Sequence, residues 1–304
     1  MRPQGSKRRI KLADKWQNSA QHKIFGSNTL GGYAMFNAAF GKLHSKYDAF
    51  LAANINPDYP IDRYVMFTNC RAWLVIDEYS HELTDAALEE FTAHPGNRAR
   101  LRFLLPDGHG SSAAIEVDFA FDANADKTVL RFKLHESGTA SANAKLIIRP
   151  DLEDRINHSV TRACDGAEHR FRHSITALEN GFDFQPSERK LSLRVSKGNF
   201  FHAPEWRYMV DLPAERYYGL PDKTDLFSPG YFSIPLEAGK AVMLIAAAKK
   251  ADEEFSDLLK FPQDDETDLF PALPASALPG TLAIPALSRF MVKRDDLGSV
   301  IAGF

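Results

Sequence analysis

The chain has 304 residues, of which 44% are hydrophobic and 25% charged, which is typical of a globular protein with one large domain or two ordinary ones. The longest apolar run, residues 241–248, lies between lysines and is too short for a membrane-spanning helix. The formal net charge of -3 provides no general attraction to nucleic acid or to an anionic membrane.

The N-terminal segment and the cysteine content indicate the cellular compartment of the protein and the kinds of site that it lacks. Residues 1–22 contain the basic cluster Lys7, Arg8 and Arg9 but lack the apolar segment of a secretory signal. We therefore expect an N-terminal tail and a cytoplasmic protein. Only Cys70 and Cys164 occur, which excludes a disulfide framework and a cysteine-rich zinc site.

From residue 64 onward the sequence consists of short apolar runs separated by turn residues. Residues 114–121 and 128–135 alternate with the period of two that predicts half-buried strands, and residues 122–126 predict a hairpin loop between them. Further strands are predicted at residues 65–67, 72–76, 101–105, 145–148, 170–178, 182–185, 190–195, 207–211, 231–236 and 241–247. Parallel strands need crossover helices, which are missing here. The pattern therefore predicts an all-β fold, an antiparallel sandwich of two large sheets over residues 23–250.

Helical signals are confined to residues 84–92 and 252–261. After Pro262, prolines fall among Ala and Leu without strand or helix period, so residues 251–304 are expected to form a short helix and a Pro-rich linker. Residues 288–294 and 299–304 have strand character around a turn at 295–298, and the sequence stops within the second run. Because natural ends are normally polar and frayed, we expect a truncated chain.

Motifs for catalysis and metal binding are weak in this sequence. No Gly-rich phosphate loop is present, and residues 110–114 lack the final glycine of a nucleophile elbow. His169 and His173 are spaced like a metalloprotease pair, but Arg170 stands where that motif needs Glu, and the local pattern indicates a surface strand. We expect neither a metal site nor a cofactor.

Two segments have the composition of a ligand site. Tyr33 directly follows paired glycines, and Trp206, Glu215, Arg216 and Asp225 lie in one loop-rich stretch with further aromatic residues. Sugars are bound by aromatic faces together with acidic and guanidinium groups that bridge hydroxyls. The alternatives are a tyrosine packed into the core at a tight turn and an ion-paired loop that covers the sandwich.

Five segments follow one another in the order of five motifs of a known family. They are residues 27–34 (SNTLGGYA), 46–57 (KYDAFLAANINP), 155–158 (RINH), 215–232 and 290–304. The corresponding family patterns are TNxLGGYA, RYHGLLVA with a following NPP, RDYH, ExxRG with DLxxPGxF, and FxVRR with VIAGY. The chain thus resembles the N-terminal domain of the bacterial and archaeal type of glycogen debranching enzyme, over nearly its whole length.

This resemblance implies a galactose-mutarotase-like super-sandwich, joined by a linker to a catalytic (α/α)6 barrel that lies outside residues 1–304. The parent enzyme would be a glycoside hydrolase of glycogen metabolism that cleaves α-1,6 branch points of α-glucans. The chain itself would contain no catalytic residue and would act as a carbohydrate-binding and scaffold domain. Its partners would be an α-glucan and its own catalytic domain, without nucleic acid or membrane.

The residues expected to contact sugar or the other domain are Tyr33, Tyr47, Trp206 and Glu215. The residues expected to brace the loops are Arg155, His158, Arg216 and Asp225. Lys46, Asp48 and Ala49 stand where the family has Arg, His and Gly. These changes weaken the case for carrying the family's substrate contacts over to this loop.

Two other functions are compatible with the sequence. The first is a self-sufficient sugar epimerase or lyase on a mutarotase-like sandwich, with His158 and Glu215 as acid and base, which requires both groups in one pocket. The second is a purely structural interaction domain, which predicts an exposed apolar patch near Phe290 and Ile301.

Overall fold

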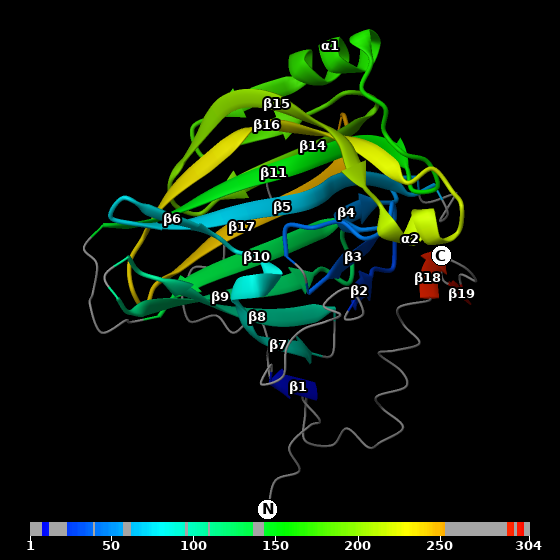
Figure 1. Cartoon of the computed structure of the whole chain (residues 1–304). Coiled ribbons are helices and arrows are strands. Elements are labelled where there is room, and N and C mark those ends of the chain that lie inside the picture. The colour runs from blue at the N-terminus through cyan, green and yellow to red at the C-terminus, as the bar shows by residue number, and fades with distance from the viewer. Residues whose placement is uncertain are drawn as a thin grey trace, which may run out of the picture.

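Two large antiparallel sheets packed face to face form the body of the protein in the computed structural model (Figure 1). The structure describes residues 8–11, 23–38, 40–56, 62–94, 97–108, 110–135, 143–252, 291–294 and 297–300. Within these residues the fold is an all-β sandwich, which confirms the prediction from the strand pattern.

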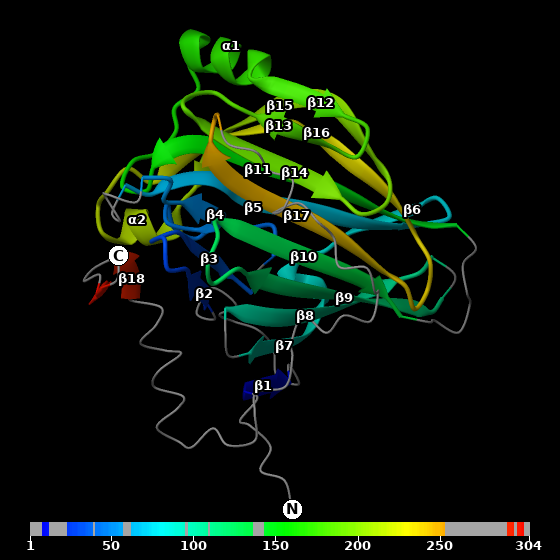
Figure 2. The same cartoon turned by 180° about the vertical axis from the view of Figure 1, so that it is seen from behind.

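One sheet has nine strands and is seen from its own side in Figure 2. In spatial order its strands are β1 (Arg8–Lys11), β7 (Leu88–His94), β8 (Arg98–Pro106), β9 (Ser112–Phe121), β10 (Lys127–Leu134), β17 (Ala241–Lys250), β14 (Arg189–Val195), β13 (Gly181–Phe184) and β12 (Ile175–Leu178). β9 and β10 are antiparallel neighbours, and Phe121 lies opposite Thr128 next to the connecting loop. The predicted hairpin is therefore confirmed. β1 extends the sheet beyond β7, although the sequence suggested only a tail there.

The other sheet has eight strands. In spatial order they are β15 (Asn199–Asp211), β16 (Lys223–Leu236), β11 (Ala144–Ile156), β5 (Tyr64–Ile76), β4 (Ala49–Ala53), β3 (Tyr33–Asn37) and β2 (Lys23–Ser27), with β6 (Tyr79–Glu82) paired to β5. A separate antiparallel pair, β18 (Met291–Arg294) and β19 (Leu297–Val300), overlaps the two strands expected there, but β19 begins at residues that were expected to form the turn.

Phenylalanines from both sheets fill the space between them. Phe36 of β3 stacks on Phe50 of β4 with ring centroids 4.4 Å apart, and it meets Phe119 of the facing sheet edge-on at 4.8 Å. These buried rings belong to one continuous apolar cluster. Burial of such large apolar surfaces is the main force that holds the two sheets together.

The helix predicted at residues 84–92 is wrong. A 3-10 turn covers Asp85–Ala87, and strand β7 follows. The register of β7 shifts between Leu88 and Glu90, so that Leu88 and Phe91 both point into the core. Because of this bulge, the two core residues are three positions apart, which is also the spacing of residues on one face of a helix.

The opposite error occurs at residues 170–178, where only Ile175–Leu178 is a strand. Helix α1 (Asp165–His173) precedes it and lies beside β15 at the top of the view in Figure 1. Cys164 occupies the N-cap without a capping hydrogen bond, and Phe171 is the buried anchor of the helix. A helix with one apolar anchor and no capping residue gives little periodic signal.

A second short helix, α2 (Pro213–Tyr217), connects β15 to β16. No helix in the described part of the chain is long and apolar enough to cross a membrane. Apart from Asp252, the helix predicted at 252–261 lies outside the described residues, as do the Pro-rich linker, Phe290 and Ile301.

The turn at residues 28–33 is locked to the β9–β10 hairpin. Asn28 Nδ2 donates to Ala125 O (2.9 Å) and Asp126 Oδ1 (2.7 Å), while Asn28 Oδ1 accepts from Gly32 N (2.8 Å). Asp126 Oδ2 also accepts from Asn54 N (3.0 Å). The Asn and Gly of this segment therefore hold the backbone of two loops together.

Candidate functional site

Three segments that are far apart in the sequence meet at one end of the sandwich. We call this place the loop–helix junction; it comprises residues 42–48, residues 155–158 and α2. Ala214 N donates to His44 O (2.9 Å), and Ser45 Oγ donates to Glu215 Oε1 (2.8 Å). Arg155, at the end of β11, donates to Lys46 O (2.6 Å). Each segment contains one of the motifs noted in the sequence.

Arg155 is held in place by a buried ion pair. Its Nε lies 2.8 Å from Glu153 Oε1, and the hydroxyl groups of Thr68 and Thr224 donate to the same carboxylate, each at 2.8 Å. Burial alone raises the pKa of a carboxyl group, but the charge and hydrogen bonds of Arg155 hold the pKa of Glu153 below its usual value. The guanidinium that supports Lys46 is therefore pre-positioned.

Tyr47 and His158 form an aromatic pair at the rim of the junction. The Tyr47 hydroxyl lies 3.2 Å from His158 Nδ1, and the two rings meet edge-on with centroids 5.8 Å apart. Lys46 Nζ lies 5.2 Å from the centroid of the Tyr47 ring. Because His158 is exposed and Tyr47 half-buried, both offer polar and aromatic contacts to a ligand.

Asp48 turns inward and caps the loop. Its Oδ2 accepts from His44 N (2.6 Å) and Ser45 N (3.0 Å). Burial raises the pKa of Asp48 to about 6, the two backbone N–H groups oppose this rise, and the nearby Glu215 carboxylate adds to it. Asp48 Oδ1 and Glu215 Oε2 are buried without a hydrogen-bond partner among the described residues. Asp48 thus shapes the loop from inside and presents no group to a ligand.

This arrangement gives the Asp48→Asn variant a defined pH dependence. The folded chain holds the Asp48 proton more tightly than the unfolded chain does, so the contribution of Asp48 to wild-type stability falls as the pH rises from about 3.8 to about 6. Relative to wild type, the variant is expected to gain about 3 kcal/mol of unfolding free energy between about pH 3.5 and about pH 7. Urea unfolding across this range measures the difference, and a difference that stays constant with pH would contradict the assignment.

Arg216 and Asp225 brace the chain near the junction. Arg216 Nε donates to Asp222 Oδ2 (2.7 Å), and its NH2 group also contacts Asp211. Asp225 is buried and accepts from Met209 N and from Ala163 N, each at 2.7 Å. These bonds close the β15–β16 connection and tie it to the segment that follows β11.

Tyr33 is a buried packing residue, which corrects the expectation that its ring contacts a sugar or the other domain, whereas Trp206 is only half-buried. Tyr33 is 1% exposed and lies in a small core with Ala49, Ala52 and Val65. Trp206 stacks on Phe171 with centroids 5.3 Å apart and packs against the main core. Glu215, also expected to make contact, is 3% exposed. The sequence pointed to these segments, but tertiary packing buries Tyr33 and Glu215 and leaves Trp206 half-buried.

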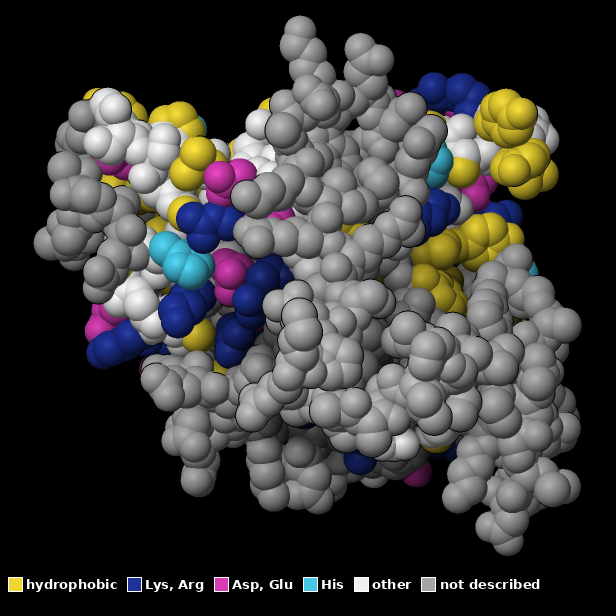
Figure 3. Space-filling view, turned by 90° about the horizontal axis from the view of Figure 1, so that it is seen from below, with side chains coloured by type: hydrophobic (Ala, Val, Ile, Leu, Met, Phe, Trp, Pro, Cys, Tyr) yellow, Lys and Arg dark blue, Asp and Glu magenta, His cyan; other side chains and the backbone are white. Residues whose placement is uncertain are grey.

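Two exposed residues of the junction were not selected from the sequence. Tyr217 and Tyr218 are 84% and 74% exposed at the end of α2. In the view from below, apolar side chains stand out on the right of the molecule, the side on which α2 lies in Figure 1 (Figure 3). The sequence feature that could have pointed to these tyrosines is their position directly after Glu215 and Arg216, which anchor the segment.

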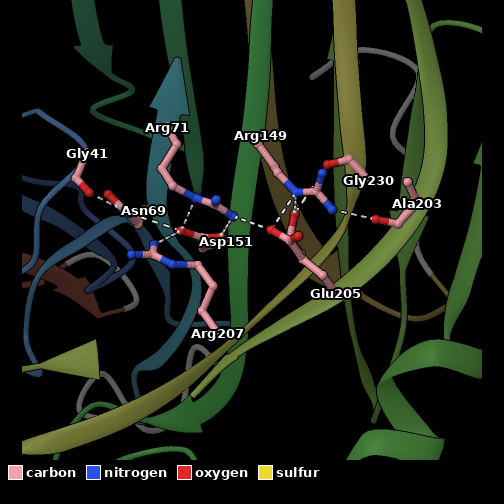
Figure 4. A network of polar contacts seen from close by, with 10 residues as sticks. Gly41, Asn69, Arg71, Arg149, Asp151, Ala203, Glu205, Arg207 and Gly230 are labelled. Atoms are coloured by element: carbon pink, nitrogen blue, oxygen red, sulfur yellow. Dashed lines mark hydrogen bonds and ion pairs between the residues drawn. The ribbon is translucent and has the colours of Figure 1, made fainter. Parts of the chain in front are cut away.

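A network of ion pairs on the outer face of the eight-stranded sheet supports the junction (Figure 4). Asp151 of β11 lies 2.7 Å from Arg71 of β5 and 2.7 Å from Arg207 of β15, and Glu205 lies 3.0 Å from Arg71 and 2.7 Å from Arg149. Asp151 is fully buried, so salt screens its ion pairs less than it screens pairs between two exposed groups. The sequence did not reveal this network, because its members come from strands paired only in the fold.

The network reaches the junction through Asn69. Its Nδ2 donates to Asp151 Oδ2 (3.0 Å) and to Gly41 O (2.9 Å). Gly41 directly precedes the 42–48 loop and has a positive φ of 80°. The loop is therefore fixed to the sheet at both ends, by Asn69 at one and by Arg155 at the other.

The chain was compared with known proteins. A family model described as "Glycogen debranching enzyme N terminal" matches residues 22–243. The chain belongs to this family. All eight residues selected from the sequence lie within the matched range. A search of curated proteins finds no match.

The solved structures that match this chain are distant. A bacterial glucoamylase complexed with acarbose has a TM-score of 0.43 and 11% identity, and the match covers 84% of this chain and 37% of the glucoamylase. A polysaccharide lyase has a TM-score of 0.33 and 10% identity, with 77% and 34% covered. The chain spans about a third of the length of these structures.

In this debranching-enzyme N-terminal domain, the histidine pair lies on a helix and not on the predicted strand. His169 and His173 of α1 have ring centroids 4.1 Å apart, as expected for positions one helical turn apart. Among the described residues, no three or more His, Cys, Asp or Glu side chains are grouped so that they could hold a metal ion.

Proposed function

We propose that this chain is the substrate-binding and scaffold domain of a glycogen-debranching-like glycoside hydrolase that acts on α-1,6 branch points of α-glucans. The observation that carries the proposal is the family match over residues 22–243. Tyr47 and His158 support the binding role, because they offer an aromatic face and hydrogen-bonding groups on a loop that buried contacts hold in place. The proposal includes a cytoplasmic location for the protein.

In the scaffold role, the domain supports a separate (α/α)6 catalytic domain, which is its second partner. The braced loops suit this role, since a loop whose conformation is fixed loses little entropy when it forms one wall of a cleft. Catalysis is assigned to the other domain, so this chain contributes binding and position.

The burial of Glu215 speaks against a self-sufficient epimerase or lyase. Acid–base catalysis would need the Glu215 and His158 groups within hydrogen-bond reach of one substrate. Glu215 is 3% exposed and accepts from Ser45, whereas His158 is exposed beside Tyr47. A carboxylate covered by protein cannot reach a substrate that His158 contacts from solvent.

Calorimetric titration of the 304-residue chain tests the proposal, with maltoheptaose and glycogen as ligands and a β-linked glucan as the control. We expect binding of the α-glucans only, and no release of glucose from branched α-glucan by this chain alone. Hydrolysis at an enzyme-like rate would overturn the assignment of catalysis to another domain. If neither α-glucan binds, the substrate-binding role is wrong and only the scaffold role stands.

A further inference from the structure

The connection between β15 and β16 presents two tyrosines to solvent. At 84% and 74%, Tyr217 and Tyr218 are the most exposed large hydrophobic side chains in the described part of the chain. Their rings meet edge-on, with centroids 5.1 Å apart and an interplanar angle of 85°. The pair therefore offers ring faces in two nearly perpendicular directions.

These tyrosines stand on a fixed base. On the inner side, Glu215 accepts from Ser45, and Ala214 donates to the backbone of His44. The backbone after the helix is closed by Tyr218 N and Leu220 N, which donate to Glu215 O at 3.1 and 2.9 Å. The exposure of the tyrosines is thus imposed by an anchored turn, so a ligand that binds them need not order the segment first.

A cluster of ion pairs is centred on Arg216, the residue directly before Tyr217. Arg216 bridges Asp211 and Asp222, and Lys223 also contacts Asp211. Hydrogen bonds from Lys223 and Arg216 lower the pKa of Asp211, and a hydrogen bond from Arg216 lowers that of Asp222. Both carboxylates are therefore ionised near neutral pH and can accept hydrogen bonds from the hydroxyl groups of a ligand.

Exposed aromatic faces next to ionised bidentate groups have the chemistry that binds a neutral, hydroxyl-rich ligand. We propose that Tyr217 and Tyr218 form the main α-glucan contact of this domain, with their rings against the apolar faces of glucose units and Asp211, Arg216 and Asp222 bonded to the hydroxyls. This inference rests on the proposed function and names the residues and ligand class for it.

The Tyr217→Ala/Tyr218→Ala double variant tests the contact by calorimetry with maltoheptaose. The double variant is expected to bind at least about tenfold more weakly, because two ring contacts are lost. The Tyr217→Phe/Tyr218→Phe variant keeps both rings and should stay within about fivefold of wild type. Tyr79→Ala is the control for loss of an exposed tyrosine: Tyr79 is 50% exposed on β6, which lies opposite α2 in Figure 1. Thermal melting of each variant verifies that it is folded.

Three results would overturn the inference. If wild type binds maltoheptaose and the double alanine variant binds it equally well, the pair is not the contact, although the proposed function stands. If wild type binds no α-glucan, the inference fails together with the substrate-binding role. If sedimentation shows a wild-type oligomer that the double alanine variant disrupts, with unchanged glucan affinity, the pair is a protein contact instead.

Discussion

We expect the Gly32→Ala substitution to lower the free energy of unfolding by about 3 kcal/mol relative to wild type. A Cβ atom at Gly32 would lie 1.9 Å from Asp126 Oδ1 and 3.0 Å from Ala52 O. Asp126 cannot move away easily, because it is buried and accepts from both Asn28 and Asn54. The substitution therefore forces apart the two loops that this turn joins.

Urea unfolding followed by circular dichroism measures the loss of stability. The matched control is Gly166→Ala in α1, where nothing lies within 4 Å of an added Cβ atom. That change is expected to leave stability within about 1 kcal/mol of wild type, since alanine favours helix. If the two variants are equally stable, the turn can accommodate a Cβ atom at residue 32, and the prediction is wrong.

The Arg155→Met variant is expected to lose about 3–5 kcal/mol of stability, the usual cost of leaving one member of a buried ion pair alone. Glu153 is fully buried and would lose its only cationic partner among the described residues, while the hydroxyl groups of Thr68 and Thr224 remain as donors. The hydrogen bond to Lys46 O is also lost, so the 42–48 loop is expected to loosen. Urea unfolding reports the first effect and proteolysis within the loop reports the second.

The pH dependence separates this ionic effect from simple loss of packing. In wild type the lowered pKa of Glu153 contributes stability that is present above its ordinary value of 4.5 and is lost as the pH falls through the folded pKa. In the variant, the buried and unpaired Glu153 carboxylate destabilises the folded state at neutral pH. Protonation at low pH removes its charge and reduces this destabilisation. The difference between variant and wild type should therefore shrink as the pH is lowered.

Arg102→Met is the matched control, because it removes the same group from a solvent-exposed pair. Arg102 lies 2.7 Å from Glu89, and their side chains are 35% and 47% exposed. Such a pair is worth less than about 1 kcal/mol. If Arg155→Met costs no more than Arg102→Met, the Glu153–Arg155 pair does not anchor the loop.

The strand pattern predicted most of the fold, because alternation depends on residues two positions apart and thus on local sequence. It worked for residues 114–121 and 128–135, which form β9 and β10. It failed at Leu88 and Phe91, where a bulge imitates a helix face, and at α1, where Phe171 is the buried anchor. Both errors arise where neighbouring strands or core packing decide a conformation that the local pattern leaves open.

The candidate site, like the fold, was predicted only in part from the sequence. The sequence pointed to the segments around Tyr47, Arg155 and Glu215, and the structure brings these segments together at one junction. Which side chains face outward could not be predicted, because exposure depends on what packs against each residue. Tyr33 is buried and Trp206 is half-buried against Phe171, whereas Tyr217 extends into solvent from an anchored turn.

The sequence by itself determined the all-β class, the family and the order of its motifs along the chain, because periodicity and motif order are properties of neighbouring residues. The tertiary structure alone decided which charges pair and which rings remain exposed. Asp151 meets Arg71 and Arg207 across separate strands, at distances of 80 and 56 residues in sequence. Contacts over such separations depend on strand order and register, and these follow from the packing of the whole sandwich.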